Sequence, residues 1–597
     1  MSTSPNSQLP KPNPGLLQIG SDSSLTSEEI LRQKVAEERR RLEQLAGVED
    51  KPVLRFLRPK EHLFTKDQRE HTTLLFGGLT WKHEKLIQGA LQALGYKCEP
   101  VMIPDKKAFQ LGKEYGNNGQ CNPTYFTVGN LVQHLQNLEE KGMSKPEILE
   151  KYIFLTAGAC GPCRFGMYEA EYRLALRNSG FDGFRVMLFQ QEGGLNQAEA
   201  EAGLEMNLDF FLGILNALNM GDVINDVAYQ IRPFEVNPGE TQRVLDECMN
   251  LMYEVIRNKE PYQLEGKMEG FFSRIGKIDT ATYLGKFINQ LYGNEFTAGL
   301  REVRDRFNGI RIDRTQIRPI VKVTGEFWAQ TTEGDGNFNM FGFLEKEGAQ
   351  VIVEPIGTWI LYMIHQVIQR LNDEKGLGEG AVLPPAWRLD KHIKINLSLK
   401  KKVLKLKLAE GIFKREYNRI IDGLGGLAHH LTDQYELQRL GHPYYNSRAG
   451  GGEGHLEVAK NIYYSNKGLC HMVLSLKPFG CMPSTQSDGA QSAVVSKYKD
   501  MIFLPIETSG EGDVNAHSRV QMALGEAKAK AKLEFKETLE STGSTLAEIR
   551  AFMDDHPETM TPLYKVPHYE GIVGTAAHFI KHIGERIKSE KPALVAV

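Results

Sequence analysis

Short apolar runs that end in glycine-containing loops recur along the chain, and stretches with helical character follow them. The first run, residues 72–76, leads into Gly77 and Gly78, and a helix predicted over 83–94 connects it to a second run at 98–103. A strand, a glycine turn, a helix and a second strand form a βαβ unit, which requires a parallel sheet. We therefore predict an α/β protein with multiple Rossmann-like lobes, parallel sheets and helical insertions.

The chain has 597 residues, which is too long for one typical domain. A tail rich in serine and proline and a charged helix occupy 1–60, where Thr26 and Glu29 are spaced as a capping box. We expect a first Rossmann-like lobe at 70–200, a helical insertion at 200–312, a second α/β lobe with a helical part at 318–440, a third α/β lobe at 455–545 and a C-terminal helical segment at 546–597.

Composition and charge exclude several classes of protein. The formal net charge is −3, so no strong overall field favours nucleic acid or an anionic surface, and we interpret the lysines crowded over 400–407 as a solvated face. The most apolar stretch, 351–371, contains charged residues, and the N-terminus has no apolar signal region. We expect a cytoplasmic protein with no membrane span and no nucleic-acid partner. In that compartment, clustered cysteines indicate metal binding or catalysis rather than disulfides.

Four of the seven cysteines lie in loops rich in glycine, proline or asparagine. Cys160, Cys163 and Cys481 come just after predicted strands, and Cys121 precedes a predicted helix. Open α/β sheets bind ligands at the carboxyl ends of their strands, so these thiols are expected to converge on one crevice. Glycine lets the backbone approach a bulky group closely, and proline stiffens the loop.

The residues by themselves leave three interpretations open: an iron–sulfur cluster, a structural zinc site, or redox-active or buried thiols. A Cys-x-x-Cys pair alone suits zinc or a thioredoxin-like motif. Structural zinc usually takes two close pairs of ligands, whereas one pair and two isolated cysteines, scattered along the chain, favour a cluster between lobes. We interpret Cys98 and Cys248 as buried small hydrophobic residues, and Cys470 as a structural residue where a strand begins.

Two of the cysteine loops resemble a known family. Segments 158–168 and 477–484 are similar to the cysteine segments of the 2-hydroxyacyl-CoA dehydratase superfamily, in the branch of CoA-activase-type and double-cubane-cluster proteins. The resemblance extends over roughly residues 70–580, through the further segments 325–328, 341–351, 507–521 and 571–577.

This resemblance implies an iron–sulfur cluster between Rossmann-like lobes. It implies Cys121, Cys163 and Cys481 as ligands, with Cys160 as a fourth that many relatives lack. Four thiolates favour a single 4Fe–4S cluster over the double-cubane type, which would need more of them. Further candidate polar groups near the site are Arg164, Glu326, Lys477 and Asn515, each of which also suits loop stabilisation.

The resemblance also implies a function, the electron-accepting component of an ATP-driven low-potential reductase or dehydratase-like system. The glycine-rich runs 423–426 and 450–454 lack the lysine of a phosphate-binding loop, and we interpret them as turns. A separate homodimeric activase ATPase with its own iron–sulfur cluster would then be the partner, in an oligomeric assembly. Two alternatives stay open: a 2-hydroxyacyl-CoA dehydratase subunit that binds a CoA-thioester substrate at the cluster, and a zinc-stabilised, non-catalytic scaffold.

Overall fold

The computed structural model describes most of the chain. Its described residues are 64–158, 163–190, 203–260, 278–374, 384–385 and 387–590, together with eight helical residues between 31 and 42. The chain divides into two compact units, Met1–Lys60 and Glu61–Val597, and the architecture below is that of the second. The predicted capping box, Thr26 with Glu29, lies outside the described residues.

Two parallel sheets of four strands form the framework of the second unit. In both sheets the strand that comes first in the chain pairs with the second on one side and with the third on the other. The first sheet has the order β2-β1-β3-β4, built from β1 (Thr73–Phe76), β2 (Cys98–Pro100), β3 (Tyr152–Gly158) and β4 (Arg185–Gln190). The second has the order β6-β5-β7-β8, built from β5 (Ile320–Gly325), β6 (Gln350–Ile352), β7 (Met472–Pro478) and β8 (Phe503–Thr508).

All the pairings between these strands are parallel, which confirms the predicted α/β class. The predicted second and third lobes, however, share one sheet. Strands β5 and β6 come from 318–440 and β7 and β8 from 455–545, and β5 pairs with β7 from Val321↔Met472 to Gly325↔Leu476. Strand β5 is buried along its whole length, so its backbone N–H and C=O groups need partners on both edges. A two-stranded unit would leave one edge unpaired.

Helices of the first lobe surround the first sheet. They begin with α2 (Trp81–Ala93), which lies within one residue or two of the predicted range and has Thr80 as its N-cap. The others are α3 (Lys106–Tyr115), α4 (Asn122–Glu140), α5 (Lys145–Lys151) and α6 (Tyr168–Asn178).

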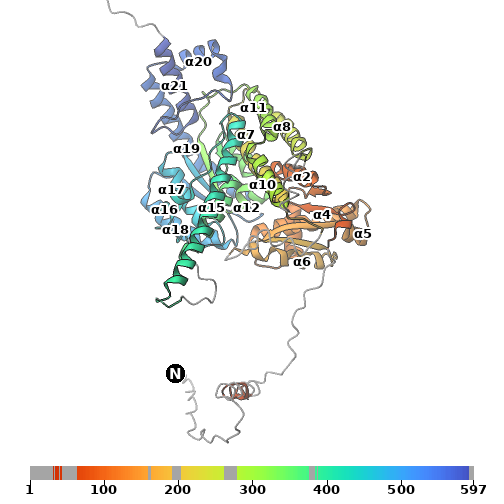
Figure 1. Ribbon diagram of the computed structural model, residues 1–597. Coiled ribbons are helices and arrows are strands. Elements are labelled where there is room, and N and C mark those ends of the chain that lie inside the picture. Colours follow the sequence, from red (N-terminus) through yellow and green to blue (C-terminus); the bar gives the residue numbers. More distant parts are fainter. Residues whose placement is uncertain are drawn as a thin grey trace, which may run out of the picture. The chain divides into compact units, whose positions relative to one another are not determined.

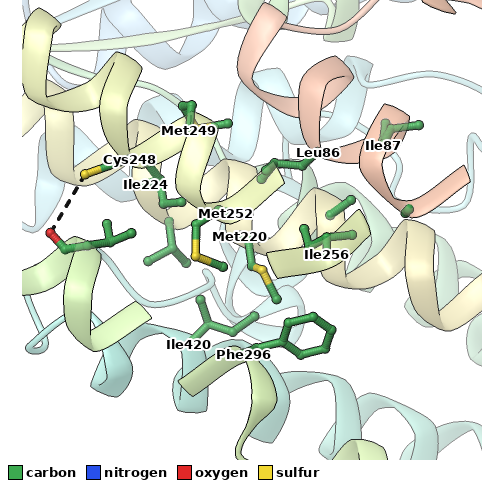
Figure 2. Close-up of a cluster of buried hydrophobic side chains, with 14 of the residues drawn as sticks. Leu86, Ile87, Met220, Ile224, Cys248, Met249, Met252, Ile256, Phe296 and Ile420 are labelled. Atoms are coloured by element: carbon green, nitrogen blue, oxygen red, sulfur yellow. Dashed lines mark hydrogen bonds between the residues drawn. The ribbon is translucent and has the colours of Figure 1, made fainter. Parts of the chain in front are cut away.

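The predicted helical insertion consists of α7 (Leu208–Ile231), α8 (Glu240–Arg257), α10 (Ile278–Tyr292) and α11 (Glu295–Asn308). Apolar side chains from α7, α8, α11, α2 and the later helix α15 (Leu389–Gly423) form one core, in which Met220, Met252 and Ile420 pack together (Figure 2). Cys248 is fully buried there, and its Sγ lies 4.0 Å from the carbonyl oxygen of Val303. This confirms Cys248 as a buried small hydrophobic residue. Cys98 and Cys470 are buried too, in other parts of the unit.

The remaining helices lie between β5 and residue 590, and several of them pack against the second sheet (Figure 1). The glycine-rich runs end α15 and precede α17, which confirms that they are turns. No helix in the described ranges is long and apolar enough to cross a membrane. These helices are α12 (Phe327–Thr331), α13 (Met340–Lys346), α14 (Ile356–Glu374), α15 (Leu389–Gly423), α16 (Gln434–Gly441), α17 (Gly454–Asn466), α18 (Met482–Lys497), α19 (Asp513–Thr542), α20 (Leu546–Asp555) and α21 (Thr575–Glu590).

Candidate functional site at the cysteine loops

Three of the predicted ligands begin helices. Cys121 is the N-cap of α4, Cys481 is the N-cap of α18, and Cys163 precedes a short 3-10 helix, Arg164–Met167. Both α-helices carry a proline in their first turn, where its fixed φ favours helix initiation and its missing N–H costs nothing. The free N–H groups of a helix start carry partial positive charge, so the ends of α4 and α18 favour a thiolate at these positions.

The Cys121 loop and the Cys481 loop are in direct backbone contact. The N–H of Asn122 donates to the carbonyl oxygen of Phe479 at 2.9 Å. Gly480 has a φ of +76°, and a Cβ added there would lie 3.3 Å from the Cα of Cys121. Glycine is therefore required at this position both for its backbone conformation and for the close approach of the two loops.

The loop before α17 connects Cys163 to the same place. Gly452 has a φ of +116°, and a Cβ on it would lie 3.7 Å from the Cβ of Cys163 and 2.4 Å from the Cγ of Pro483. The structure thus brings together the loops of Cys121, Cys163 and Cys481. Cys160 lies outside the described residues.

Two of the cysteine loops follow strands that occupy the same position in the two sheets. Cys163 follows β3, and Cys481 follows β7, which is the strand in the matching position of the second sheet. Glu326 follows β5, the neighbour of β7. Strand order reverses between β1 and β3 and between β5 and β7, and the loops at such a switch point lead to opposite faces of the sheet. That divergence opens the crevice in which α/β proteins bind ligands.

Buried carboxyl groups lie beside the thiols. Glu326 is the N-cap of α12, and burial raises its pKa to about 7. Burial also raises the pKa of Glu453 to about 8, with further contributions from the charges of Glu326 and Glu457. Glu453 therefore favours its protonated form at neutral pH, whereas Glu326 gains and loses its proton close to neutral pH. Glu326 was expected near the site from the sequence and Glu453 was not, although an acidic residue in a glycine-rich run just before a helix was a usable signal.

Glu457 is a second residue that sequence analysis missed. It is buried on α17, and its carboxylate accepts hydrogen bonds from the hydroxyls of Ser484, at 2.7 Å, and Ser487. Both serines lie on α18, so Glu457 positions the helix that Cys481 begins. We consider it a positioning residue.

The thiols are in an environment that keeps them protonated. Burial raises the pKa of Cys121, Cys163 and Cys481, and the negative charge of Glu326 raises each further. Hydrogen bonds act in the opposite direction at Cys121, because its Sγ lies 3.2 Å from the Tyr168 hydroxyl and 3.1 Å from the Thr124 hydroxyl, and both lower its pKa. Thiols like these ionise when a metal supplies the missing positive charge.

The other predicted polar groups stabilise loops or lie apart. Arg164 donates to the carbonyl oxygen of Gly119, which fixes the loop before Cys121. Lys477 is buried, which lowers its pKa, and it pairs with Asp488. Asn515 is exposed in the first turn of α19.

The donor chemistry fits an iron–sulfur cluster, because thiolates are its usual protein ligands and N–H groups near its sulfurs tune its potential. In the described part of the chain, no group of three or more histidine, cysteine, aspartate or glutamate side chains is arranged to hold a metal ion. No protein-family model matches the chain, and no curated protein matches it. The family resemblance therefore stays a prediction.

Proposed function

We propose that the chain is the iron–sulfur electron-accepting component of a low-potential reductase or 2-hydroxyacyl-CoA dehydratase-like system. Cys121, Cys163 and Cys481 would hold the cluster, with Cys160 as the fourth ligand of a 4Fe–4S centre. The observation that carries the proposal is the meeting of three cysteine loops at the strand ends of two sheets of equal topology: the Cys121 and Cys481 loops are in backbone contact, and the loop of Gly452 lies against both Cys163 and Pro483. When bound, such a cluster supplies one-electron transfer.

The chain's own residues would set the conditions for that transfer. Cys121 and Cys481 are buried, which excludes water from two of the ligand positions. The starts of α4 and α18 stabilise negative charge at the same two sulfurs. The Tyr168 hydroxyl donates to the Cys121 thiolate, and a hydrogen bond to a ligand sulfur raises the reduction potential.

The energy for low-potential reduction would come from another protein. The two glycine-rich runs of this chain are turns without the features of a phosphate-binding loop. We therefore propose a separate homodimeric ATPase with its own iron–sulfur cluster as the electron donor. Its binding would be transient, because the donor must leave to be reduced again. ATP would favour the docked conformation through its higher affinity for that state.

A second candidate function is supported by the buried acids. Beside the cysteine loops, Glu453 favours its protonated form at neutral pH and Glu326 titrates close to it, and a protonated carboxyl there is suited to donate a proton to a departing hydroxyl group. This favours a dehydratase subunit that binds a CoA thioester at the same site. A spectral change on adding a 2-hydroxyacyl-CoA to the anaerobic protein would support this function over simple electron transfer.

Anaerobic purification with iron, sulfide and zinc quantified tests the proposal. We expect brown protein with roughly four irons and matching sulfide per chain. Cys121→Ala, Cys163→Ala or Cys481→Ala should each lose or convert the cluster. Cys248→Ala, which removes a thiol buried in the core of α7, α8 and α11, is the matched control and should keep it. Stoichiometric zinc without sulfide would refute the proposal and favour the zinc-stabilised scaffold.

Cys160→Ala decides the number of ligands. If the centre has four protein ligands, this variant should convert it to a three-iron form or change its spectrum. An unchanged spectrum would indicate three protein ligands and one iron open to substrate, which would favour the dehydratase function.

A further inference from the structure

The N-terminal part of α15 stands apart from the packed body. The buried residues of this helix begin at Glu410, and none precedes it in the helix. Residues 389–409, the α15 arm, therefore span about 30 Å of helix without a buried side chain. Figure 1 shows α15 extending beyond the neighbouring helices. Such an exposed length of helix calls for an explanation, because most helical stability comes from packing an apolar face.

The arm carries an apolar stripe that nothing in the described chain covers. Its members follow one another at intervals of four, four, seven and four residues, a spacing that places them along one face of a helix. Trp387, just before the helix, is 75% exposed. The stripe consists of Leu389 (68% exposed), Ile393 (66%), Leu397 (54%), Leu404 (68%) and Leu408 (63%).

The arm is also strongly basic, in a chain with a net charge of −3. Its one acidic residue, Asp390, pairs with Arg388 at 2.9 Å. No ion pair involves the arm's lysines within the described ranges, so their charges are uncompensated. These lysines are Lys391, Lys394, Lys400, Lys401, Lys402, Lys405 and Lys407.

We propose that the α15 arm binds the surface of an anionic lipid membrane. A helix that combines an apolar stripe with many lysines lies in the membrane interface, with the stripe toward the acyl chains. Most of the lysines face the headgroups, and Lys400 and Lys407, which lie on the face of the stripe, reach them with their long side chains. A tryptophan at its end suits the same boundary. Sequence analysis interpreted the lysines as a solvated face, and the exposed stripe beside them is what changes that interpretation.

The charge of the arm argues against a second copy of the chain as the occupant. Pairing two arms through their stripes would bring two lysine-rich segments together with no acidic residues to oppose them. A nucleic acid would match the charge, but it would leave five large aliphatic side chains exposed to water. An anionic membrane satisfies both the charge and the apolar stripe.

Co-sedimentation of the full-length protein with lipid vesicles tests the proposal. We expect binding to vesicles of phosphatidylcholine mixed with phosphatidylglycerol, little binding to phosphatidylcholine alone, and weaker binding as salt screens the lysines. Equal binding to both vesicles, or to neither, would overturn the proposal. Self-association of the protein without lipid, lost on changing the stripe, would instead assign the stripe to a second copy of the chain and overturn it.

Two double variants test the contributions of the lysines and of the apolar stripe separately. Lys401→Glu with Lys402→Glu should weaken binding about tenfold or more, because each lysine near an anionic surface contributes to affinity. Leu404→Ser with Leu408→Ser should also weaken membrane binding, even at low salt.

Matched controls come from α19, which has exposed residues of both kinds. Lys532→Glu with Lys536→Glu and Met522→Ser with Leu533→Ser should leave binding unchanged. Circular dichroism would verify that all four proteins fold. If the arm variants bind as their controls do, the arm is not the membrane-binding surface.

Discussion

Replacing Gly480 by alanine should loosen the contact between the Cys121 and Cys481 loops. The φ of Gly480 is +76°, and a Cβ there would lie 3.1 Å from the carbonyl oxygen of Gln120 and 3.3 Å from the Cα of Cys121. A non-glycine residue in the left-handed region costs about 1–2 kcal/mol. Forcing a methyl group against packed backbone adds about 1–3 kcal/mol. The total, about 2–5 kcal/mol, corresponds to local opening at least about thirtyfold more frequent.

Hydrogen–deuterium exchange followed by mass spectrometry measures this opening directly. Unlike a global unfolding curve, it does not need two-state behaviour from a chain of this size. We expect faster exchange in peptides that cover the starts of α4 and of α18. The readout does not depend on a bound cluster, so it tests the geometry of the loops separately from their function.

Gly119→Ala is the matched control. Gly119 has a φ of +79° and lies two residues before Cys121, but a Cβ there would have no heavy atom within 4 Å. The substitution should therefore cost only the backbone strain of about 1–2 kcal/mol, and it should affect the Cys121 loop alone. If Gly480→Ala and Gly119→Ala accelerate exchange equally and in the same peptides, the two loops do not press on each other as argued.

Three further predictions concern other parts of the molecule. Lys322→Met should destabilise the second sheet by at most about 3–5 kcal/mol, because it removes the nearer of the two ammonium groups that pair with buried Glu354: Lys322 lies 2.6 Å from its carboxylate and Lys460 lies 3.6 Å away. In urea unfolding, Lys151→Met, which breaks an exposed pair, should leave the midpoint nearly unchanged. Burial raises the pKa of Glu84 to about 8 from 4.5, so the folded state holds a proton that the unfolded state has lost, and stability falls as pH rises between these values. Glu84→Gln should flatten that fall in urea midpoints measured across the range, and an unchanged slope would contradict the assignment. The isolated chain should hydrolyse no ATP, and its cluster spectrum should change only when activase, reductant and ATP are all present; reduction without nucleotide would count against the proposed partner.

The sequence determined the elements of the fold and the residues of the candidate site that carry thiols. Apolar runs followed by glycine predicted β1, β5 and β7 close to their observed bounds, because strand and turn preferences act over a few residues. The same local rules placed Cys163 and Cys481 in loops just after predicted strands and Cys121 in a loop before a predicted helix. Cys248 was assigned to a core from its apolar helical neighbours, and it is fully buried.

Only the tertiary structure decided which of these elements come together. The pairing of β5 with β7 spans a long helical insertion, so no local pattern joined the two predicted lobes into one sheet. The buried environment that raises the pKa of Glu453 is made by the packing of α17 and the cysteine loops. A carboxyl group in a glycine-rich run has the same sequence signal whether water or protein surrounds it. Burial and proximity depend on contacts between distant segments, and those contacts turn three scattered cysteine loops into one candidate site.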